Sequence, residues 1–575
     1  MYILGVNAYH GDSSACVYKN GTLIAATEEE RFRRIKHWAG FPSQAIEFCL
    51  KEAGIKVQDL DYIAISRDPK ANFGKKVVTA LKQKLSIKNI IDRVSNLKKA
   101  ASIEDEFISL FKLQSGELKA KIVNVEHHRA HLASAFFPSP FEKSALLSID
   151  GMGDFTSTMI GTGEGTQISV LDSVSYPHSV GIFYTTFTQW LGFPHYGDEY
   201  KVMGLAPYGE AKYVDKLRQV LKFLPNGLFE LNLDYFNHAK KGVNMVWEGG
   251  IPAVDSIYSD KLIAEFGPVR KAEDKLEQYH YDMAASVQRF TEELIYHILN
   301  GLHARTGLDS VCIAGGVAQN SVANGKIIQN TPFKKLYIPP AGHDAGTAIG
   351  AALWVYHQEL KNNREEVMWH GYFGAKFTNA EVEAVLKAQN IDYRVLNDSE
   401  LFDEVSQCLI DGGVVGWFQG RAEFGPRALG HRSILADPRR TDAKEILNAK
   451  IKRRESFRPF APSILKEHTA TYFERVDDVP FMEKVFVIKP EMRASIPAVT
   501  HVDGTGRLQT VDANIEPKYY GLIAAFHQKS GVPILLNTSF NENEPIVNKP
   551  EEALACYLRT KMDMLVMENV VIRRS

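Results

Sequence analysis

The chain opens with YILGVNAYHGDSSACVYKNGTLIAA (residues 2–26), in which three short apolar runs alternate with small polar turns. The runs Tyr2–Asn7, Ser14–Tyr18 and Thr22–Ala26 have the length and composition of β-strands. Asn20-Gly21 separates the last two, and an Asn-Gly pair between two strands is the strongest local signal for a hairpin. The turn 8–13 is small and polar enough to let backbone amides approach a phosphate. The sequence therefore predicts three strands with a candidate phosphate-binding turn after the first.

A further strand ends in paired glycines. Val311–Ala314 is an apolar run that leads into Gly315 and Gly316, followed by Asn320. Without side chains, the glycines would let a nucleoside lie against bare backbone. A tight turn would explain the pair equally well, so this feature alone does not establish a nucleotide site.

Three distant segments offer ligands for one divalent metal. His127 and His131 are four residues apart, so on a helix both imidazoles stand on the same face. Asp150 follows the apolar run 145–149, and Asp344 comes soon after the run 336–338. Both runs are typical of buried strands, so we expect each carboxylate to lie at a strand end that lines a crevice. Two nitrogens and two oxygens suit Fe(II), Zn(II) or Mn(II). A histidine pair alone is more often an accident of a helix surface.

The chain thus contains, in order, a hairpin, a strand followed by Asp-Gly and a strand followed by Gly-Gly. This order resembles the layout of the actin, sugar-kinase and Hsp70 ATPase superfamily. More specifically, the chain resembles the bacterial O-carbamoyltransferase family over nearly its whole length. In the N-terminal part the resemblance is carried by residues 5–15, 28–32, 125–131 and 201–209 and by the Gly315 and Asp344 segments. In the C-terminal part it is carried by residues 420–430, 457–462, 501–509 and 536–541.

This resemblance implies an α/β protein of two domains. Residues 1–360 would form an actin/Hsp70-like ATPase domain similar to TsaD, the enzyme of tRNA threonylcarbamoylation, and 375–575 a YrdC-like α/β domain. The YrdC-like domain would convert carbamoyl phosphate and ATP, with Mg, into carbamoyl adenylate. The TsaD-like domain, holding Fe(II) or another divalent metal, would pass the carbamoyl group to a hydroxyl of a small-molecule acceptor such as an antibiotic, a sugar or a toxin-like natural product. The motifs do not choose among these acceptors.

The family pattern and side-chain chemistry together give a set of candidate site residues. His10 is the candidate general base, because an imidazole titrates near neutrality and the first turn would place it over the nucleotide phosphate. A histidine that only binds phosphate or caps the turn is the alternative. Guanidinium groups bind phosphate oxygens through pairs of hydrogen bonds, so arginines are candidate phosphate ligands. Ser539-Phe540-Asn541 matches the Ser-x-Asn element of YrdC-type domains. The residues expected to bind nucleotide or carbamoyl adenylate are Lys201, Gly204, Gly315, Gly316, Asn320, Arg421, Arg427, Lys444, Asn448, Arg454, Arg458, Arg507, Ser539 and Asn541.

Bulk properties agree with this picture. A chain of 575 residues, 45% of them hydrophobic, can bury ample core in at least two domains. A net charge of −2 gives no general attraction to nucleic acid or to an anionic membrane. The five cysteines form no CxxC motif, which favours reduced residues in the core. The N-terminus opens on a strand, and the two observations together predict a cytoplasmic location. A homodimer is the commonest state for such enzymes, although the sequence does not fix it.

Three further segments have structural interpretations. The polar run 358–366 predicts a domain boundary, and a capped helix is expected to start at Thr378. Apolar residues at helical spacing from Met283 to Ile298 predict a core helix. Residues 70–100 are rich in Lys and Arg but poor in aromatic residues, so we interpret them as a helical insertion with a solvated basic face rather than a nucleic-acid site.

Two other classes of function remain open from the sequence. A sugar-kinase-like phosphotransferase would use the nucleotide pocket alone and release ADP, but it would not need the Arg-rich C-terminal part. A non-catalytic subunit in tRNA modification would need a basic surface that the first domain lacks outside 70–100.

Overall fold

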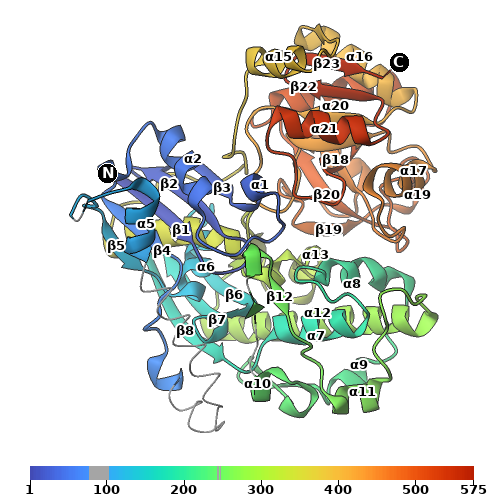
Figure 1. The fold of residues 1–575 in the computed structure, drawn as a ribbon. Helices are drawn as coiled ribbons and strands as arrows, with labels where there is room; N and C mark the ends of the chain where they lie inside the picture. Colours follow the sequence, from blue (N-terminus) through green and yellow to red (C-terminus); the bar gives the residue numbers. More distant parts are fainter. Residues whose placement is uncertain (77–102, 115, 242–244, 247, 575) are drawn as a thin grey trace. The chain divides into compact units, whose positions relative to one another are not determined.

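The computed structural model describes residues 1–76, 103–114, 116–241, 245–246 and 248–574. The chain folds into two compact units (Figure 1). The first comprises residues 1–320 and 327–368, and the second comprises 321–326 and 369–575.

The first sheet of the first unit contains the three strands expected at the N-terminus. Its order is β3-β2-β1-β4-β5. Strands β1 and β2, and β2 and β3, pair antiparallel, whereas β4 and β5 add in parallel beside β1. The bounds are β1 (Tyr2–Asn7), β2 (Ser14–Lys19), β3 (Thr22–Glu28), β4 (Tyr62–Ile65) and β5 (Lys121–Asn124). The predicted hairpin at Asn20-Gly21 is therefore confirmed.

The second sheet of this unit repeats the topology of the first. Its order is β8-β7-β6-β13-β14, with two antiparallel pairs followed by two parallel ones. The strands are β6 (Lys143–Gly153), β7 (Thr156–Glu164), β8 (Gln167–Ser175), β13 (Ser310–Ala314) and β14 (Lys335–Tyr337). Two sheets with one shared topology are the arrangement expected of the actin-like superfamily, and the predicted α/β fold class is confirmed.

Helices α6 (His127–Phe136) and α14 (Thr347–Leu353) pack against one another and against these sheets. Helix α12 (Gln278–Thr306) buries the predicted apolar stripe from Met283 to Ile298. The other helices of eight or more residues in the described part of the unit are α2 (Ser43–Ala53), α5 (Ile103–Phe111) and α7 (Val180–Trp190), with α13 (Ser321–Asn330) straddling the division between the units. Shorter elements include α1 (Glu30–Arg33), α8 (Glu199–Leu205), α9 (Val214–Leu217), α10 (His238–Lys241), α11 (Asp260–Phe266), β9 (Leu221–Phe223), β10 (Phe229–Leu231), β11 (Met245–Val246) and β12 (Ala253–Val254).

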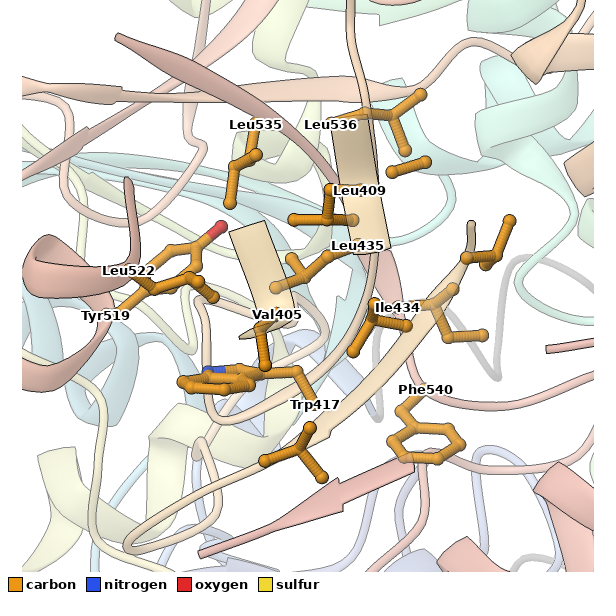
Figure 2. Close-up of a cluster of buried hydrophobic side chains, with 14 of the residues drawn as sticks. Val405, Leu409, Trp417, Ile434, Leu435, Tyr519, Leu522, Leu535, Leu536 and Phe540 are labelled. Carbon is orange, nitrogen blue, oxygen red and sulfur yellow. The ribbon is translucent and has the colours of Figure 1, made fainter. Parts of the chain in front are cut away.

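The second unit is built on one mixed nine-stranded sheet, in the order β15-β23-β22-β16-β17-β21-β18-β20-β19. Its strands are β15 (Arg394–Val395), β16 (Val415–Phe418), β17 (Arg432–Ala436), β18 (Ala461–Leu465), β19 (Lys484–Val487), β20 (Thr505–Val511), β21 (Ile534–Ser539), β22 (Met564–Met567) and β23 (Val570–Arg573). Its main helices are α15 (Asn379–Ala388), α16 (Asp398–Ile410), α20 (Pro517–Ser530) and α21 (Pro550–Arg559), with short α17 (Ala443–Ile446), α18 (Thr469–Tyr472) and α19 (Pro490–Arg493). Figure 2 shows Leu409 of α16, Leu435 of β17 and Leu536 of β21 in one buried cluster.

The domain boundary differs in detail from the sequence prediction. The units change at residue 368, inside the expected interval between 360 and 375, and 321–326 groups with the second unit, which the sequence did not indicate. Helix α15 begins after Thr378, whose hydroxyl accepts a hydrogen bond from the Glu381 amide at 3.3 Å, so the predicted cap is confirmed. The insertion expected at 70–100 lies outside the described residues from 77 onwards. All five cysteines are buried, and none of them forms a disulfide among the described residues. Among the described residues, no helix combines the length and apolar character needed to cross a bilayer.

Gly350 allows α14 and α6 to meet backbone to backbone. A Cβ atom at this position would lie 1.8 Å from the carbonyl oxygen of Ala130. Backbone atoms in the middle of a packed helix cannot move aside cheaply, so we expect Gly350→Ala to lower the free energy of unfolding by about 1–3 kcal/mol. Chemical denaturation of the full chain measures this cost. Gly74→Ala is the control, because no atom lies within 4 Å of its Cβ position; equal stability of both variants would contradict the packing argument.

Candidate functional site

Helix α6 presents two histidines to the interior of the first unit. His127 and His131 stand one turn apart, their rings are edge to face at 4.6 Å, and their Nε2 atoms are 3.1 Å apart. Two carboxylates fix the start of the helix. Glu126 accepts a hydrogen bond from the Arg129 amide at 2.8 Å, and Asp154 accepts one from the His127 amide at 2.9 Å. The helix is therefore held at the end that carries the first histidine.

Asp150 and Asp344 complete a four-residue cluster. Asp150 lies near the end of β6, and Asp344 lies in the turn between β14 and α14. The His127 and His131 Nε2 atoms lie 3.2 and 3.4 Å from Asp150 Oδ2, and 3.6 and 3.4 Å from Asp344 Oδ1. One ligand atom from each residue falls within 4.8 Å of all the others, and all four residues are buried. The structure thus brings together the four side chains that the sequence singled out as metal ligands.

The chemistry of this cluster fits a divalent cation. Asp344 Oδ1 is buried without a hydrogen-bond partner and faces both imidazoles. Burial alone would lower the pKa of His131, but the carboxylates of Asp150 and Asp344, each 3.4 Å from its Nε2, raise it to about 9. The cluster therefore keeps a proton among its four ligand atoms when no cation is present. A cation bound by two nitrogens and two oxygens would displace this proton and neutralise the carboxylates.

His10 adds a third imidazole beside the cluster. Its Nδ1 lies 2.6 Å from Asp344 Oδ2, its Nε2 lies 3.2 Å from the Met152 carbonyl, and its ring is 4.7 Å from that of His127. Burial alone would lower the pKa of His10, but the charges of Asp344 and Asp150 raise it above the usual value. The turn after β1 therefore delivers His10 to the predicted metal ligands.

The same turn is less open to phosphate than the sequence suggests. The amides of Tyr9 and Ser13 already donate hydrogen bonds to the carbonyls of Gly40 and Trp38, both at 2.9 Å. A phosphate would have to use the other amides of the turn. Gly11 is needed for packing, because a Cβ atom there would lie 2.3 Å from the Tyr196 hydroxyl.

Sequence reasoning missed a second polar cluster next to this turn. Asp12, Glu30 and His37 each place a ligand-type atom within 4.8 Å of the others. His37 Nδ1 lies 2.8 Å from Asp12 Oδ1, and the His37 amide donates to Glu30 Oε2 at 2.9 Å. Burial alone would lower the pKa of His37, but Asp12 raises it to about 9. Asp12 and Glu30 both lie in stretches that carried the family resemblance, which was the available signal.

Five other predicted residues of the first unit are engaged with the protein itself. Gly315 has a positive φ of 99°, and a Cβ there would lie 2.2 Å from the Ile149 carbonyl oxygen. The Gly316 amide donates to Asp150 Oδ1 at 3.0 Å. The paired glycines thus form a tight turn that supports a candidate ligand. The side-chain amide of Asn320 exchanges two hydrogen bonds of 3.0 Å with Gln288. Lys201 forms an ion pair with Asp198 at 2.8 Å, and Gly204 lies within α8.

Three arginines come together in the second unit. The pKa of Arg507 is lowered well below its usual value by burial and by the positive charges of Arg427 and Arg454. The Nε atom of Arg507 is buried without a hydrogen bond. Like charges held together in a partly buried place create a strong positive potential. The cluster of Arg427, Arg454 and Arg507 is therefore suited to a polyanion.

The other predicted residues of this unit surround or support the arginine cluster to different degrees. Burial lowers the pKa of His501 to about 4, and the charges of Lys444 and Arg507 act in the same direction, so Lys444 belongs to the same surroundings. Asn448 accepts a hydrogen bond from Arg454 Nε at 2.8 Å. Arg458 pairs with Glu455 at 2.6 Å. Arg421 donates to the carbonyls of Phe373 and Gly374, which indicates a structural role for its guanidinium.

Lys452 organises the Ser-x-Asn element. Its side chain is buried, and its Nζ donates to Ser539 Oγ at 3.2 Å and to Asn541 Oδ1 at 2.6 Å. Ser539 Oγ also donates to Asn541 Oδ1 at 2.9 Å. Ser539 and Asn541 were predicted as site residues from the sequence, but Lys452 was not singled out from the many cationic residues near it. Only the folded chain brings position 452 to positions 539 and 541.

Comparison with known protein families agrees with this two-part arrangement. The model of the carbamoyltransferase N-terminus matches residues 2–353, and that of the carbamoyltransferase C-terminus matches residues 406–574. The chain belongs to the carbamoyltransferase family.

Relatives of this carbamoyltransferase cover it almost completely. An uncharacterized protein of Synechocystis sp. is 41% identical over 607 residues, covering 100% of this chain and 97% of the relative. The nodulation protein NolNO of Sinorhizobium fredii is 37% identical over 99% of this chain and 80% of its own length. Nodulation protein U of Bradyrhizobium diazoefficiens is 26% identical over 94% of this chain and 92% of its own length.

Two solved structures show weaker similarity to this carbamoyltransferase. Component A of the Acidaminococcus fermentans (R)-2-hydroxyglutaryl-CoA dehydratase is 15% identical, with a TM-score of 0.35 over 63% of this chain and 100% of that chain. HypF of T. kodakarensis is 14% identical, with a TM-score of 0.32 over 62% of this chain and 48% of that chain. Neither similarity carries a conclusion about this chain.

The His37–Asp12 ion pair predicts a specific dependence of stability on pH. Because the folded-state pKa of His37 is about 9 and the unfolded value is near 6.5, the pair stabilises the fold fully below about pH 6.5 and loses its effect as the pH rises through 9. We expect His37→Gln to lower the free energy of unfolding by up to about 2 kcal/mol at pH 6 and by almost nothing at pH 10.

Urea unfolding of metal-depleted protein at several pH values measures this difference. His195→Gln is the control, because His195 is exposed and makes no side-chain hydrogen bond in the described structure. A deficit of His37→Gln that stays constant from pH 6 to pH 10 would refute the ionic interpretation.

Proposed function

We propose that this carbamoyltransferase is an ATP-dependent O-carbamoyltransferase. It forms carbamoyl adenylate from carbamoyl phosphate and ATP, and then transfers the carbamoyl group to a hydroxyl of a small-molecule acceptor, such as an antibiotic, a sugar or a toxin-like natural product. The observation that carries the proposal is the cluster of His127, His131, Asp150 and Asp344 with His10 beside it. The arginine cluster of the second unit supplies the other half of the chemistry.

The adenylation half requires a site for several phosphate groups. Carbamoyl phosphate is hydrolysed to carbamate and phosphate, a carbamate oxygen attacks the α-phosphorus of Mg-bound ATP, and pyrophosphate leaves. Arg427, Arg454 and Arg507 would hold the phosphate oxygens through paired, charge-assisted hydrogen bonds. Ser539 and Asn541, aligned by Lys452, would orient the small carbamate. The YrdC-like assignment of this unit rests on that Ser-x-Asn element.

The transfer half requires an activated carbonyl and an activated hydroxyl. A divalent cation held by the four-residue cluster, Fe(II) in our assignment, would polarise the carbamoyl carbonyl as a Lewis acid. The acceptor oxygen attacks the carbamoyl carbon, AMP leaves, and the hydroxyl proton must pass to a base. His10 is the candidate for that base, because its Nδ1 contacts Asp344 although it is not one of the four proposed ligands.

The state of His10 depends on its carboxylate neighbours. The charges of Asp344 and Asp150 raise its pKa, which favours a protonated imidazole in the metal-free protein. Neutralising these carboxylates removes that effect and lowers the pKa of His10 towards the range in which Nε2 accepts a proton. Base catalysis by His10 is thereby coupled to occupation of the metal centre.

The metal centre is tested by removing one ligand. We expect His131→Ala to weaken binding of Fe(II) or Zn(II) to the full chain by at least about a hundredfold, since loss of an outer contact already costs 10- to 100-fold. Metal content and titration calorimetry provide the measurement. His128→Gln is the matched control: His128 is equally buried on the same helix, but bonds Ser148 and the Thr156 carbonyl instead of the cluster. Equal metal affinity of both variants would reject the assignment.

The reaction is tested by its products. Wild-type protein should release AMP and pyrophosphate from ATP only when carbamoyl phosphate is present, whereas a sugar-kinase-like phosphotransferase would release ADP. We expect His10→Asn to keep the release of pyrophosphate within about threefold while lowering transfer to an acceptor by 10²- to 10⁴-fold, the usual contribution of a general base.

Chromatography of the nucleotides and mass spectrometry of candidate alcohols follow the two steps separately. ADP as product, or pyrophosphate release that ignores carbamoyl phosphate, would overturn the proposed function. Unchanged carbamoyl transfer by His10→Asn would remove only the role of this residue. Absence of any turnover, with binding of a tRNA, would favour the non-catalytic alternative.

A further inference from the structure

A second group of ligand-type side chains lies beside the turn that carries His10. Asp12, Glu30 and His37 each place one such atom within 4.8 Å of the others. They come from three separate places: the turn after β1, the first residue of α1 and the loop that follows α1. The proposed adenylation and transfer steps use none of these three residues, so the cluster is open to another role.

The cluster is assembled but not sealed from solvent. Asp12 is 8% exposed, whereas Glu30 and His37 are only partly buried. His37 Nδ1 lies 2.8 Å from Asp12 Oδ1, and the His37 amide donates to Glu30 Oε2 at 2.9 Å. These contacts hold two carboxylates and one imidazole together. Because two of the three side chains are partly exposed, an ion can reach them from solution.

The backbone is held in an unusual conformation at two of the three residues. Asp12 and His37 both lie in the left-handed region, each with a φ of 55°, which residues other than glycine rarely adopt. Such conformations persist where surrounding contacts enforce them, and they are common at ligand-binding sites. Gly197 makes room for the His37 ring, because a Cβ atom at Gly197 would lie 2.3 Å from His37 Nε2. The local structure therefore favours the position of the imidazole over a relaxed backbone.

A buried nitrogen near the cluster lacks a partner. His343 Nδ1 is buried and has no hydrogen bond among the described residues. Burial alone would raise the pKa of Asp12, but the charges of His37 and His343 lower it, which places His343 near this carboxylate. A buried polar atom without a partner is costly unless a ligand or an ordered water satisfies it. A water or an oxyanion bound to a cation in the cluster would supply such a partner.

One turn connects this cluster with the four proposed metal ligands. His10 Nδ1 lies 2.6 Å from Asp344 Oδ2, and Asp12 follows two residues later to contact His37. Tyr196 packs on the same region, with its ring edge to face with that of His37 at 5.4 Å. A cation at the second cluster would therefore lie close to the proposed transfer centre.

We propose that Asp12, Glu30 and His37 form a second divalent-cation site, which takes a transition-metal ion such as Zn²⁺ or Mn²⁺. Two carboxylate oxygens and one imidazole nitrogen form a mixed ligand set that suits these ions. Three protein ligands leave coordination positions open, as in catalytic rather than structural metal sites, and an oxygen of water or of a substrate would occupy them. The cation would displace the proton between His37 and Asp12 and neutralise the two carboxylates.

The test measures two binding events on the full chain. Metal-depleted protein is titrated with Zn²⁺ in a calorimeter, and bound metal is counted after dialysis. We expect the wild type to bind two equivalents. Glu30→Gln should weaken the second event at least about tenfold and leave the first unchanged, whereas His131→Ala should do the reverse. Glu30→Gln keeps an oxygen that can accept the hydrogen bond from the His37 amide, so this variant should fold. Glu47→Gln, which changes an exposed carboxylate of α2 outside the cluster, is the matched control.

Each failure has its own signature. One equivalent in the wild type, lost in His131→Ala and unchanged in Glu30→Gln, would overturn the second site and leave the proposed function intact. One equivalent lost in Glu30→Gln but kept in His131→Ala would support the second site and reject the proposed transfer centre. A second event that Glu47→Gln weakens as much as Glu30→Gln does, or that needs more than about 1 mM Zn²⁺, would show an adventitious ion only and overturn the proposal.

A series of cations tests the imidazole as a ligand. The His131→Ala protein isolates the second site. We expect it to bind Zn²⁺ more tightly than Mg²⁺ or Ca²⁺, because these hard cations prefer oxygen ligands. Adding His37→Gln should remove most of this preference, whereas adding Glu30→Gln should weaken all three cations. A preference for Ca²⁺ over Zn²⁺, or a preference for Zn²⁺ that His37→Gln leaves unchanged, would overturn the assignment of His37 as a ligand.

Discussion

Two imidazoles and two carboxylates facing one buried centre impose the main constraint on the first unit. The two Nε2 atoms are 3.1 Å apart, and Asp344 Oδ1 has no hydrogen-bond donor. Such a group is costly to bury unless a positive charge compensates it. In the metal-free protein a proton does so, which is why the pKa of His131 rises to about 9. The surrounding contacts keep these side chains from separating: Asp154 ties the start of α6, and Gly350 lets α14 press on the same helix.

In the second unit the constraint comes from clustered positive charge rather than from clustered carboxylates. Arg427, Arg454 and Arg507 repel one another, and burial strengthens the repulsion by excluding water. Lys452 shows the contrasting case in the same unit, because its buried charge is satisfied by four oxygen acceptors on Ser539 and Asn541. The Lys452 side chain holds the Ser-x-Asn element in place, whereas the three arginines gather positive charge that suits a bound polyanion. We therefore assign a positioning role to Lys452 and propose anion binding for the three arginines.

Local patterns in the sequence were enough for much of the fold and for the choice of the four residues proposed to bind a metal. The Asn20-Gly21 hairpin, the cap at Thr378 and the i, i+4 spacing of His127 and His131 depend on short-range geometry, and each appears as predicted. Contacts between distant segments were not predictable in this way. Nothing local indicates that His37 meets Asp12 or that residues 321–326 group with the second unit. Arg421 shows the same limit: its charge suggested a phosphate contact, and only the folded chain shows that its guanidinium also donates to the carbonyls of Phe373 and Gly374.

The electrostatics of the two units explain why adenylation and transfer are assigned to separate places. An adenylate forms where negative charge accumulates, on the α-phosphate and pyrophosphate, and a set of guanidinium groups lowers the energy of that charge. Those same groups would hold AMP and slow its departure in the transfer step. A centre of two carboxylates and two imidazoles would instead hold a cation that polarises a carbonyl, and these four residues include no guanidinium group that would retain the departing nucleotide. If adenylation and carbamoyl transfer shared one pocket, both steps would be slowed. Carboxylates placed near the arginines would pair with them, and this pairing would remove the electric field that each step requires.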